Sequence, residues 1–290
     1  MTWEETIRFI RTQEDYRELV EQSYLDENLR INVERFRSSR EFEETLKIIK
    51  TFMPNAKEIL DIGAGNGISS VAFSVKGYNV TAAEPDTSDT VGSGAIRILK
   101  NEMNLSNLKI INSYGEKLPF DEAIFDVVYI RQAMHHANDL DAFIKEASRV
   151  LKPGGLLLTI RDHIIYGKKD KELFLRTHPL QKFYGGENAF TFAEYSAAMH
   201  NAELHVVRRL KYYESPINYF PAPESEILDA SKAIRKKFKL SIQKRFGSWA
   251  VNFPFLHLLE LISIIRNGKW MDERRVPGRM NSFIAIKNSL

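Results

Sequence analysis

The feature that most constrains the fold of this chain is a glycine-rich loop between an apolar run and a helical pattern. Residues 58–67 read EILDIGAGNG, with a glycine at every second position of the loop. Glycine lets the backbone turn sharply and lets a ligand approach closely, because it has no Cβ. Apolar residues then recur at helical spacing over 68–75, so the loop joins a strand to a helix. Since free N–H groups at a helix N-terminus attract anionic groups, the segment predicts a nucleotide-type binding site.

The spacing of the glycines distinguishes between two kinds of nucleotide site. The dinucleotide fingerprint is G-x-G-x-x-G, but its third glycine position is Ile68 here. The loop instead reads G-x-G-x-G after Asp61, and a second apolar run ends at Glu84, 21 positions after Gly63. An acid at the end of a second strand suits hydrogen bonds to two ribose hydroxyls. The pattern therefore argues against a nicotinamide dehydrogenase.

Three more motifs follow Glu84 along the chain. They are LPF at 118–120 with FDVVY at 125–129, MHH at 134–136, and RVLKPGG at 149–155 ahead of an apolar run. Together with the loop and Glu84, they resemble the class I S-adenosylmethionine-dependent methyltransferases, in particular the small-molecule group that includes quinone C-methyltransferases. The resemblance covers roughly residues 56–213. It implies S-adenosylmethionine as the cofactor.

The resemblance also implies a set of cofactor-binding residues. They are Asp61, Gly63, Gly65, Gly67, Glu84, Gly115, Glu116 and Arg131. Asp61 would orient the loop and the methionine amine, and Glu84 would bind the ribose hydroxyls. Relatives often carry an aspartate near the adenine where Tyr114 stands, so adenine contacts would rest on backbone groups near Gly115 and Glu116. Arg131 follows the fourth strand, where contact with cofactor or substrate and simple surface exposure both remain open.

Two histidines are candidate general bases. His163 ends the fifth predicted strand, which in an open parallel sheet faces the ligand crevice. An imidazole titrates near neutral pH, so His163 is the first candidate and His135 the second. A packing or substrate-positioning role is the alternative for both. No metal site is expected, because the adjacent pair His135 and His136 seldom converges on one ion and the chain has no cysteine.

Alternating strand and helix patterns predict an α/β fold with a parallel sheet covered on both faces. With the resemblance, this becomes a Rossmann-like, seven-stranded, mostly parallel sheet with an antiparallel last strand. Residues 1–55 are expected to form an N-terminal helical lid, and residues 56–213 the cofactor-binding domain. Residues 214–281 form a helical insertion that begins at the ligand edge, and is interpreted as a substrate cap. Residues 282–290 supply the last strand.

A basic amphipathic helix is predicted within that insertion. Residues 232–245 carry seven lysines and arginines and no acid. The helix has three interpretations. It could contact an anionic membrane surface or a lipid-linked phosphate, it could capture an acidic acceptor, or it could be a lid helix with a solvated basic face. The net charge of +3 does not demand nucleic acid. The start of the chain lacks the apolar core of a signal peptide, and the longest apolar stretch is short of the roughly 20 residues of a membrane span, so a cytoplasmic protein is expected.

The expected reaction is methyl transfer by in-line displacement to a small-molecule acceptor, sugar-like or lipid-linked. An oxygen acceptor needs its proton removed, which His163 or His135 could do. The sequence RQAM at 131–134 replaces the motif of certain amino-methylating relatives, which lowers the expectation of a nucleic-acid substrate. A non-catalytic S-adenosylmethionine-binding scaffold and a membrane-surface binding protein are the alternatives. The oligomeric state is not predicted.

Overall fold

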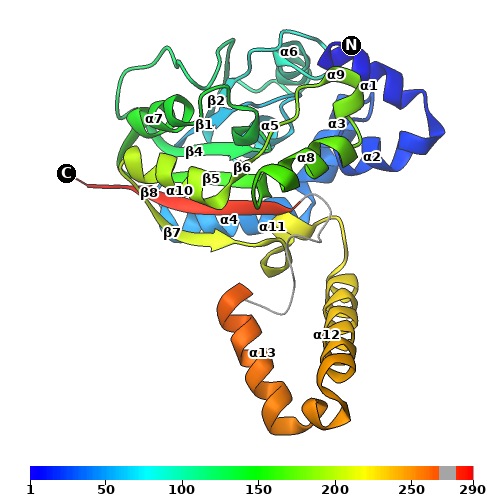
Figure 1. Cartoon of the computed structure of the whole chain (residues 1–290). Coiled ribbons are helices and arrows are strands. Elements are labelled where there is room, and N and C mark those ends of the chain that lie inside the picture. The colour runs from blue at the N-terminus through cyan, green and yellow to red at the C-terminus, as the bar shows by residue number, and fades with distance from the viewer. Residues whose placement is uncertain (268–278, 290) are drawn as a thin grey trace.

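A computed structural model describes residues 1–267 and 279–289. Its central sheet has the strand order β3-β2-β1-β4-β5-β8-β7 (Figure 1). The strands are β1 (Glu58–Ile62), β2 (Asn79–Ala83), β3 (Leu108–Ile111), β4 (Phe125–Arg131), β5 (Leu151–Ile165), β6 (Phe190–Thr191), β7 (Leu204–Leu210) and β8 (Met280–Lys287). β8 runs antiparallel to both β5 and β7, whereas the pairs from β3 to β5 are parallel. The predicted Rossmann-like fold with an antiparallel last strand is confirmed.

Helices cover both faces of this sheet because its strands are apolar on both sides. Alternate residues of a strand point to opposite faces, so Ile59 enters one core while Leu60 enters the other. The first core contains residues of α3 (Leu29–Arg37), α4 (Arg40–Phe52), α5 (Ile68–Val75) and α6 (Ser93–Glu102). The second contains residues of α7 (Leu140–Val150) and α10 (Phe192–Asn201). The central strands are therefore covered on both faces, and the glycine loop lies at the carboxyl end of β1.

The N-terminal helices pack beside that loop. α1 (Trp3–Arg11), the short helix η1 (Glu14–Tyr16) and α2 (Arg17–Gln22) precede α3. Thr2 and Glu5 form a capping box that begins α1. The ring of Trp3 packs on Tyr184 of α9 (Gln181–Tyr184) with 4.9 Å between centroids. The side-chain amide of Asn66 in the glycine loop donates to the carbonyl of Tyr24 at 2.8 Å. The segment before β1 is thus tied directly to the predicted ligand loop.

β5 is longer than its apolar run predicts. The fifth predicted strand ends at His163, whereas β5 continues to Ile165. Its last residues pair with β6 and with the start of β8, which lie far along the chain. The register shifts between Thr159 and Asp162, where Arg161 adopts a φ of +60°. The helix α8 (Lys168–Thr177) follows, and then α9 leads to β6.

A helical hairpin projects from the sheet between β7 and β8 (Figure 1). β7 ends at Leu210, earlier than the predicted 213, because η3 (Tyr212–Glu214) and α11 (Pro216–Tyr219) begin there. The predicted helical insertion contains two long helices, α12 (Glu224–Phe246) and α13 (Phe253–Asn267), joined by η4 (Ser248–Val251). An ion pair of 3.5 Å joins Arg40 of α4 to Glu224 at the base of α12.

The direction of this hairpin bears on the predicted substrate cap. The hairpin extends away from the sheet in Figure 1, so closure over the ligand edge stays a prediction. Residues 268–278 of the predicted insertion lie outside the described residues. Among the helices that are described, none has the length and apolar character needed to cross a membrane.

Candidate active site

The three glycines of the loop differ in what surrounds them. All three have positive φ: +68° at Gly63, +55° at Gly65 and +83° at Gly67. A Cβ on Gly63 would lie 2.4 Å from the Cβ of Ala133, so this glycine is required for contact with the loop after β4. At Gly65 the nearest atom to a Cβ would be the carbonyl oxygen of Val91, at 3.8 Å. Gly65 is therefore the position whose backbone a ligand can approach.

Glu84 connects the end of β2 to this loop. One of its carboxylate oxygens accepts a hydrogen bond from the backbone N–H of Gly65 at 2.7 Å, and the other accepts from that of Asp86 at 2.9 Å. Burial raises the pKa of Glu84 to about 7. Each carboxylate oxygen has a further lone pair. The side chain thus lies beside Gly65 with acceptor capacity for ligand hydroxyls.

Asp61 is buried below the loop at the end of β1. One of its carboxylate oxygens accepts from the hydroxyls of Ser69 at 2.6 Å and Ser70 at 2.5 Å. The other, Oδ1, is buried and has no hydrogen-bond partner among the described residues. Burial raises the pKa of Asp61 to about 6. An unsatisfied buried carboxylate oxygen is costly, so a cationic ligand group here would fit the site.

The predicted adenine residues make structural contacts of their own. A Cβ on Gly115 would lie 2.2 Å from a ring carbon of Phe143 on α7, so close packing accounts for this glycine. The carboxylate of Glu116 accepts from the backbone N–H of Asn138 at 2.9 Å, just before α7. A cofactor role for both residues stays a prediction. Asn112, which the sequence interpretation passed over, donates to the carbonyl of Glu84 at 3.0 Å and follows β3 directly.

Arg131 is buried in an ion pair rather than exposed. Its guanidinium makes two hydrogen bonds to Glu41 of α4, at 2.6 and 3.1 Å. Burial opposes its charge, but the Glu41 carboxylate outweighs burial and raises the pKa of Arg131. Arg161 lies 3.5 Å from the same carboxylate. Arg131 therefore anchors an N-terminal helix to the end of β4, and its predicted contact with the cofactor is untested.

The two candidate bases lie together in a buried group of side chains. We call His135, His163, His178 and Glu187 the histidine cluster. The His135 and His163 rings are 4.8 Å apart, and the His163 and His178 rings 5.8 Å apart. Nε2 of His135 is 3.8 Å from Oε2 of Glu187, which lies after α9. The cluster adjoins the glycine loop, because Ala133, two residues before His135, contacts Gly63.

Asp162 fixes the orientation of His135. One oxygen of its carboxylate accepts from the backbone N–H of His135 at 3.1 Å and is 3.0 Å from Nδ1 of the ring. Burial lowers the pKa of His135 well below its ordinary value and raises that of Asp162 well above its own. With Nδ1 donating to Asp162, Nε2 of His135 keeps a lone pair directed toward Glu187. A neutral imidazole in this state can accept a proton or hold a ligand.

Comparison with known proteins agrees with this geometry. Residues 60–159 match the family described as a methyltransferase domain. The sterol 4-C-methyltransferase strm-1 of Caenorhabditis elegans is 31% identical over 183 residues, covering 59% of this chain and 53% of that protein. The ubiquinone/menaquinone biosynthesis C-methyltransferase UbiE of Shewanella sp. (strain ANA-3) is 30% identical over 130 residues, covering 43% of this chain and 49% of that protein. The chain thus spans about half the length of the curated relatives it matches.

Solved structures share the fold at lower identity. The crystal structure of the YcgJ protein from Bacillus subtilis superposes with a TM-score of 0.53 and 17% identity, covering 86% of this chain and 100% of that one. The order of the motifs, the family match and the glycine loop with Glu84 lead to the same family. Residues 60–159 form a methyltransferase domain, the chain is similar to class I S-adenosylmethionine-dependent methyltransferases, and S-adenosylmethionine is its cofactor.

Proposed function

We propose that the chain transfers a methyl group from S-adenosylmethionine to a small-molecule acceptor. The observation that carries the proposal is the contact between Glu84 and Gly65 at the one loop glycine with open space before it. It joins the ends of β1 and β2, where a nucleoside is bound in folds of this kind. The fit of the cofactor rests on this contact and on the unsatisfied oxygen of Asp61.

Each residue of the site has a separate task in this proposal. Glu84 accepts from the ribose hydroxyls, and Oδ1 of Asp61 accepts from the ammonium of the methionine end. The cofactor supplies a methyl group activated by a positively charged sulfur. The site then needs mainly to hold the acceptor atom in line with that methyl group and to exclude water. If the acceptor atom is an oxygen, His163 takes its proton, with His135 as the second candidate.

We infer that the acceptor is lipid-like rather than freely diffusing and highly polar. The inference is supported by the names of two relatives, a sterol 4-C-methyltransferase and a C-methyltransferase of ubiquinone/menaquinone biosynthesis. A sugar-like acceptor is the alternative, since the turn at Gly185 and Gly186 lies beside the histidine cluster and could bind hydroxyls. His136 Nδ1 is 3.0 Å from the carbonyl of Gly186, which already fixes part of this turn.

The test is a transfer assay with methyl-labelled S-adenosylmethionine. Sterol, quinone-precursor and glycolipid panels are offered in parallel, and labelled products are identified by mass spectrometry. We expect product from one lipid-like class, and a His163→Ala variant that loses rate while its cofactor affinity is unchanged. An unchanged rate in this variant would remove His163 as the base. Tight cofactor binding without any labelled product would instead favour the non-catalytic scaffold.

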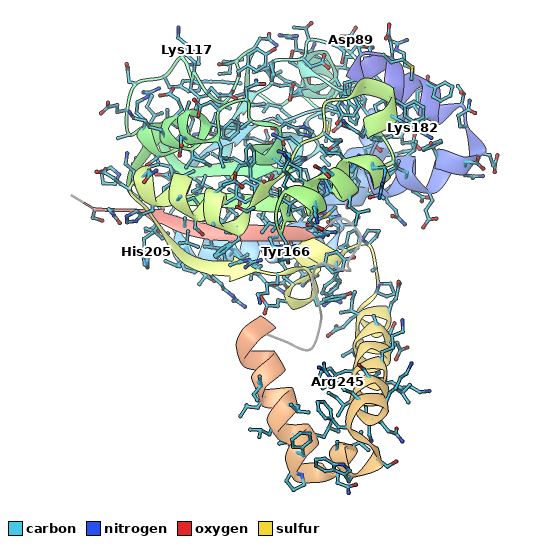
Figure 2. The ribbon with its side chains drawn as sticks, viewed as in Figure 1. Asp89, Lys117, Tyr166, Lys182, His205 and Arg245 are labelled. Carbon is cyan, nitrogen blue, oxygen red and sulfur yellow. The ribbon has the colours of Figure 1, made fainter. Side chains whose placement is uncertain are left out.

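We also propose that the α12–α13 hairpin contacts an anionic membrane surface. Exposed cations gather on α12, at Lys232, Lys236, Lys237, Lys239, Lys244 and Arg245. Large apolar side chains are exposed around the tip, where Trp249 is 62% and Phe246 43% exposed. Figure 2 shows Arg245 on the hairpin, away from the sheet. Cations beside exposed aromatic residues are typical of peripheral binding to anionic lipids.

Liposome flotation tests this contact. Wild-type protein should float with vesicles that contain anionic lipid and remain behind with neutral vesicles. A variant with Lys236, Lys237 and Lys244 changed to glutamate should not float, whereas the same three positions changed to arginine should behave as wild type. Equal flotation with neutral and anionic vesicles, or no flotation at all, would contradict the proposal.

A further inference from the structure

We infer that His135, His163 and Glu187 form a binding site for a divalent transition metal of the zinc class. Each offers one ligand atom, and these atoms all lie within 4.8 Å of one another. The three residues come from separate segments: η2 (Met134–His136) after β4, the end of β5, and the turn after α9. The expectation of no metal rested on the neighbours His135 and His136 and on the lack of cysteine. The structure instead brings His135 together with His163 and Glu187.

The support behind His135 has the form found at metal sites. Its Nδ1 lies 3.0 Å from Asp162, whose carboxylate also accepts the backbone N–H of His135. Histidine ligands usually donate their second nitrogen to a carboxylate or carbonyl, which fixes the ring and raises the basicity of the other nitrogen. The free nitrogen, Nε2, faces Glu187 Oε2 at 3.8 Å. The ring is therefore held in the orientation that a metal ligand needs.

Unsatisfied buried atoms point to a missing cation. The Glu187 side chain is only 5% exposed, yet its Oε2 has no hydrogen-bond partner among the described residues. The other oxygen of Glu187 accepts from the hydroxyl of Tyr184. Nδ1 of His178 is buried without a hydrogen bond as well, 3.5 Å from that carboxylate. A buried carboxylate oxygen without a donor is costly, and a metal ion at this point would satisfy it.

A bound ion would draw the three ligand atoms closer together. Zinc lies roughly 2.0–2.2 Å from nitrogen and oxygen ligands, so two ligand atoms of one tetrahedral ion are about 3.3–3.6 Å apart. The ligand atoms here lie within 4.8 Å of one another, so the widest pair would have to close by about 1.2–1.5 Å. Glu187 lies outside the strands and helices, so it can supply that movement. Two imidazoles and one carboxylate suit zinc, cobalt or ferrous iron rather than magnesium, which prefers oxygen ligands.

Three protein ligands leave one coordination position open, as in catalytic zinc sites. The cluster lies at the carboxyl ends of β4 and β5, so an oxygen of the acceptor could occupy that position. This role rests on the methyl transfer proposed above, but metal binding itself does not. With the metal bound, His135 and His163 act as ligands, so the base role proposed above applies to the metal-free site. His178 is close enough to Glu187 to orient it or to serve as a fourth ligand.

The experiment is calorimetric titration of chelator-treated full-length protein with Zn²⁺, Co²⁺ and Mg²⁺. We expect about one Zn²⁺ or Co²⁺ per chain, visible absorption from bound Co²⁺, and no binding of Mg²⁺. Glu187→Gln and His163→Gln should each weaken Zn²⁺ binding at least tenfold. Asp162→Asn should weaken it about 10–100-fold, as for other outer-shell partners of metal ligands. The matched control is His205→Gln on β7, an exposed histidine that should leave binding unchanged.

Two results would overturn the inference. One is wild-type protein that binds neither Zn²⁺ nor Co²⁺ stoichiometrically, and the other is Glu187→Gln protein that binds as wild type does. Circular dichroism of each metal-free variant identifies any that fails to fold, and Glu187→Gln keeps the size of the side chain. Cofactor binding is measured on the same samples. Wild-type protein that binds the cofactor but no metal would refute this site alone, whereas metal binding without methyl transfer would refute only the proposed function.

Discussion

Replacing Glu84 with glutamine tests how the site recognises its cofactor. The Glu84 carboxylate accepts from two backbone N–H groups, of Gly65 and Asp86, and burial raises its pKa to about 7. Hydroxyls of the ribose would donate to the ionised form. Binding should therefore strengthen as the pH rises through about 7, because an increasing fraction of the carboxylate is ready to accept.

The size of this effect follows from the pKa. With a pKa of about 7, about one-eleventh of the carboxylate is ionised at pH 6 and about ten-elevenths at pH 8, so affinity should rise about tenfold, or about 1.4 kcal/mol. Glutamine offers one neutral acceptor oxygen in place of a carboxylate, so the ribose hydroxyls lose a charged acceptor. A hydrogen bond to a charged group contributes about 1.5–3 kcal/mol. We expect weakening of about 10–100-fold at pH 8, with most of the pH response lost.

The assay is calorimetric titration with S-adenosylhomocysteine, the product form, which avoids turnover. Asp89→Asn is the control, since this exposed acid lies at the surface in Figure 2 and should keep the wild-type response. Asp61, with a pKa of about 6, titrates lower and accounts for any residual rise between about pH 5 and pH 6.5 in the Glu84 variant. A tenfold pH response that survives Glu84→Gln, or wild-type affinity that falls with pH, would refute the reasoning.

Three further predictions concern stability and the loop. Gly65→Val should abolish S-adenosylhomocysteine binding and cost about 1–2 kcal/mol of folding free energy because of the positive φ at this position. Gly63→Ala should lower the melting temperature more than Gly65→Val does, because its Cβ would lie 2.4 Å from that of Ala133. A larger loss of melting temperature in Gly65→Val would contradict the loop assignment. Glu41→Ala should reduce the free energy of unfolding in urea by about 3–5 kcal/mol, since Arg131 stays buried without its partner, and a loss below 1 kcal/mol would count against this anchor. Without cofactor, burial in the folded chain raises the pKa of Glu84 from 4.5 to about 7. The stability contributed by its protonated form should therefore be complete below pH 4.5 and lost as the pH rises through about 7. If the difference in free energy of unfolding between wild type and Glu84→Gln stays constant across that range, this prediction is refuted.

Local signals in the sequence were sufficient for the fold and for the glycine loop between β1 and α5. The run that contains Ile59 and Leu60 is apolar without interruption because the two residues face different cores. The loop glycines lie close in sequence to Asp61 before them and Glu84 after them, so their spacing alone predicts which edge of the sheet binds a ligand. Glu84 could be found for the same reason, since it ends the next strand.

The rest of the site depends on contacts between distant segments. Glu41 and Arg131 are 90 positions apart, and no spacing rule pairs them. The proposed metal ligands His135, His163 and Glu187 come from three segments, and Glu187 lies in a stretch without regular secondary structure. Gly115 shows a different limit, because a glycine required by the packing of Phe143 looks the same in sequence as one required by a ligand. The length of β5 was missed because β6 and β8 decide it.

The most direct test of the central claim is a crystal structure of the full chain with S-adenosylhomocysteine. We expect electron density for the ligand along residues 63–67, with both ribose hydroxyls within hydrogen-bond distance of the Glu84 carboxylate and the ammonium beside Asp61. Ligand bound at another edge of the sheet, or a ribose without contact to Glu84, would contradict the account.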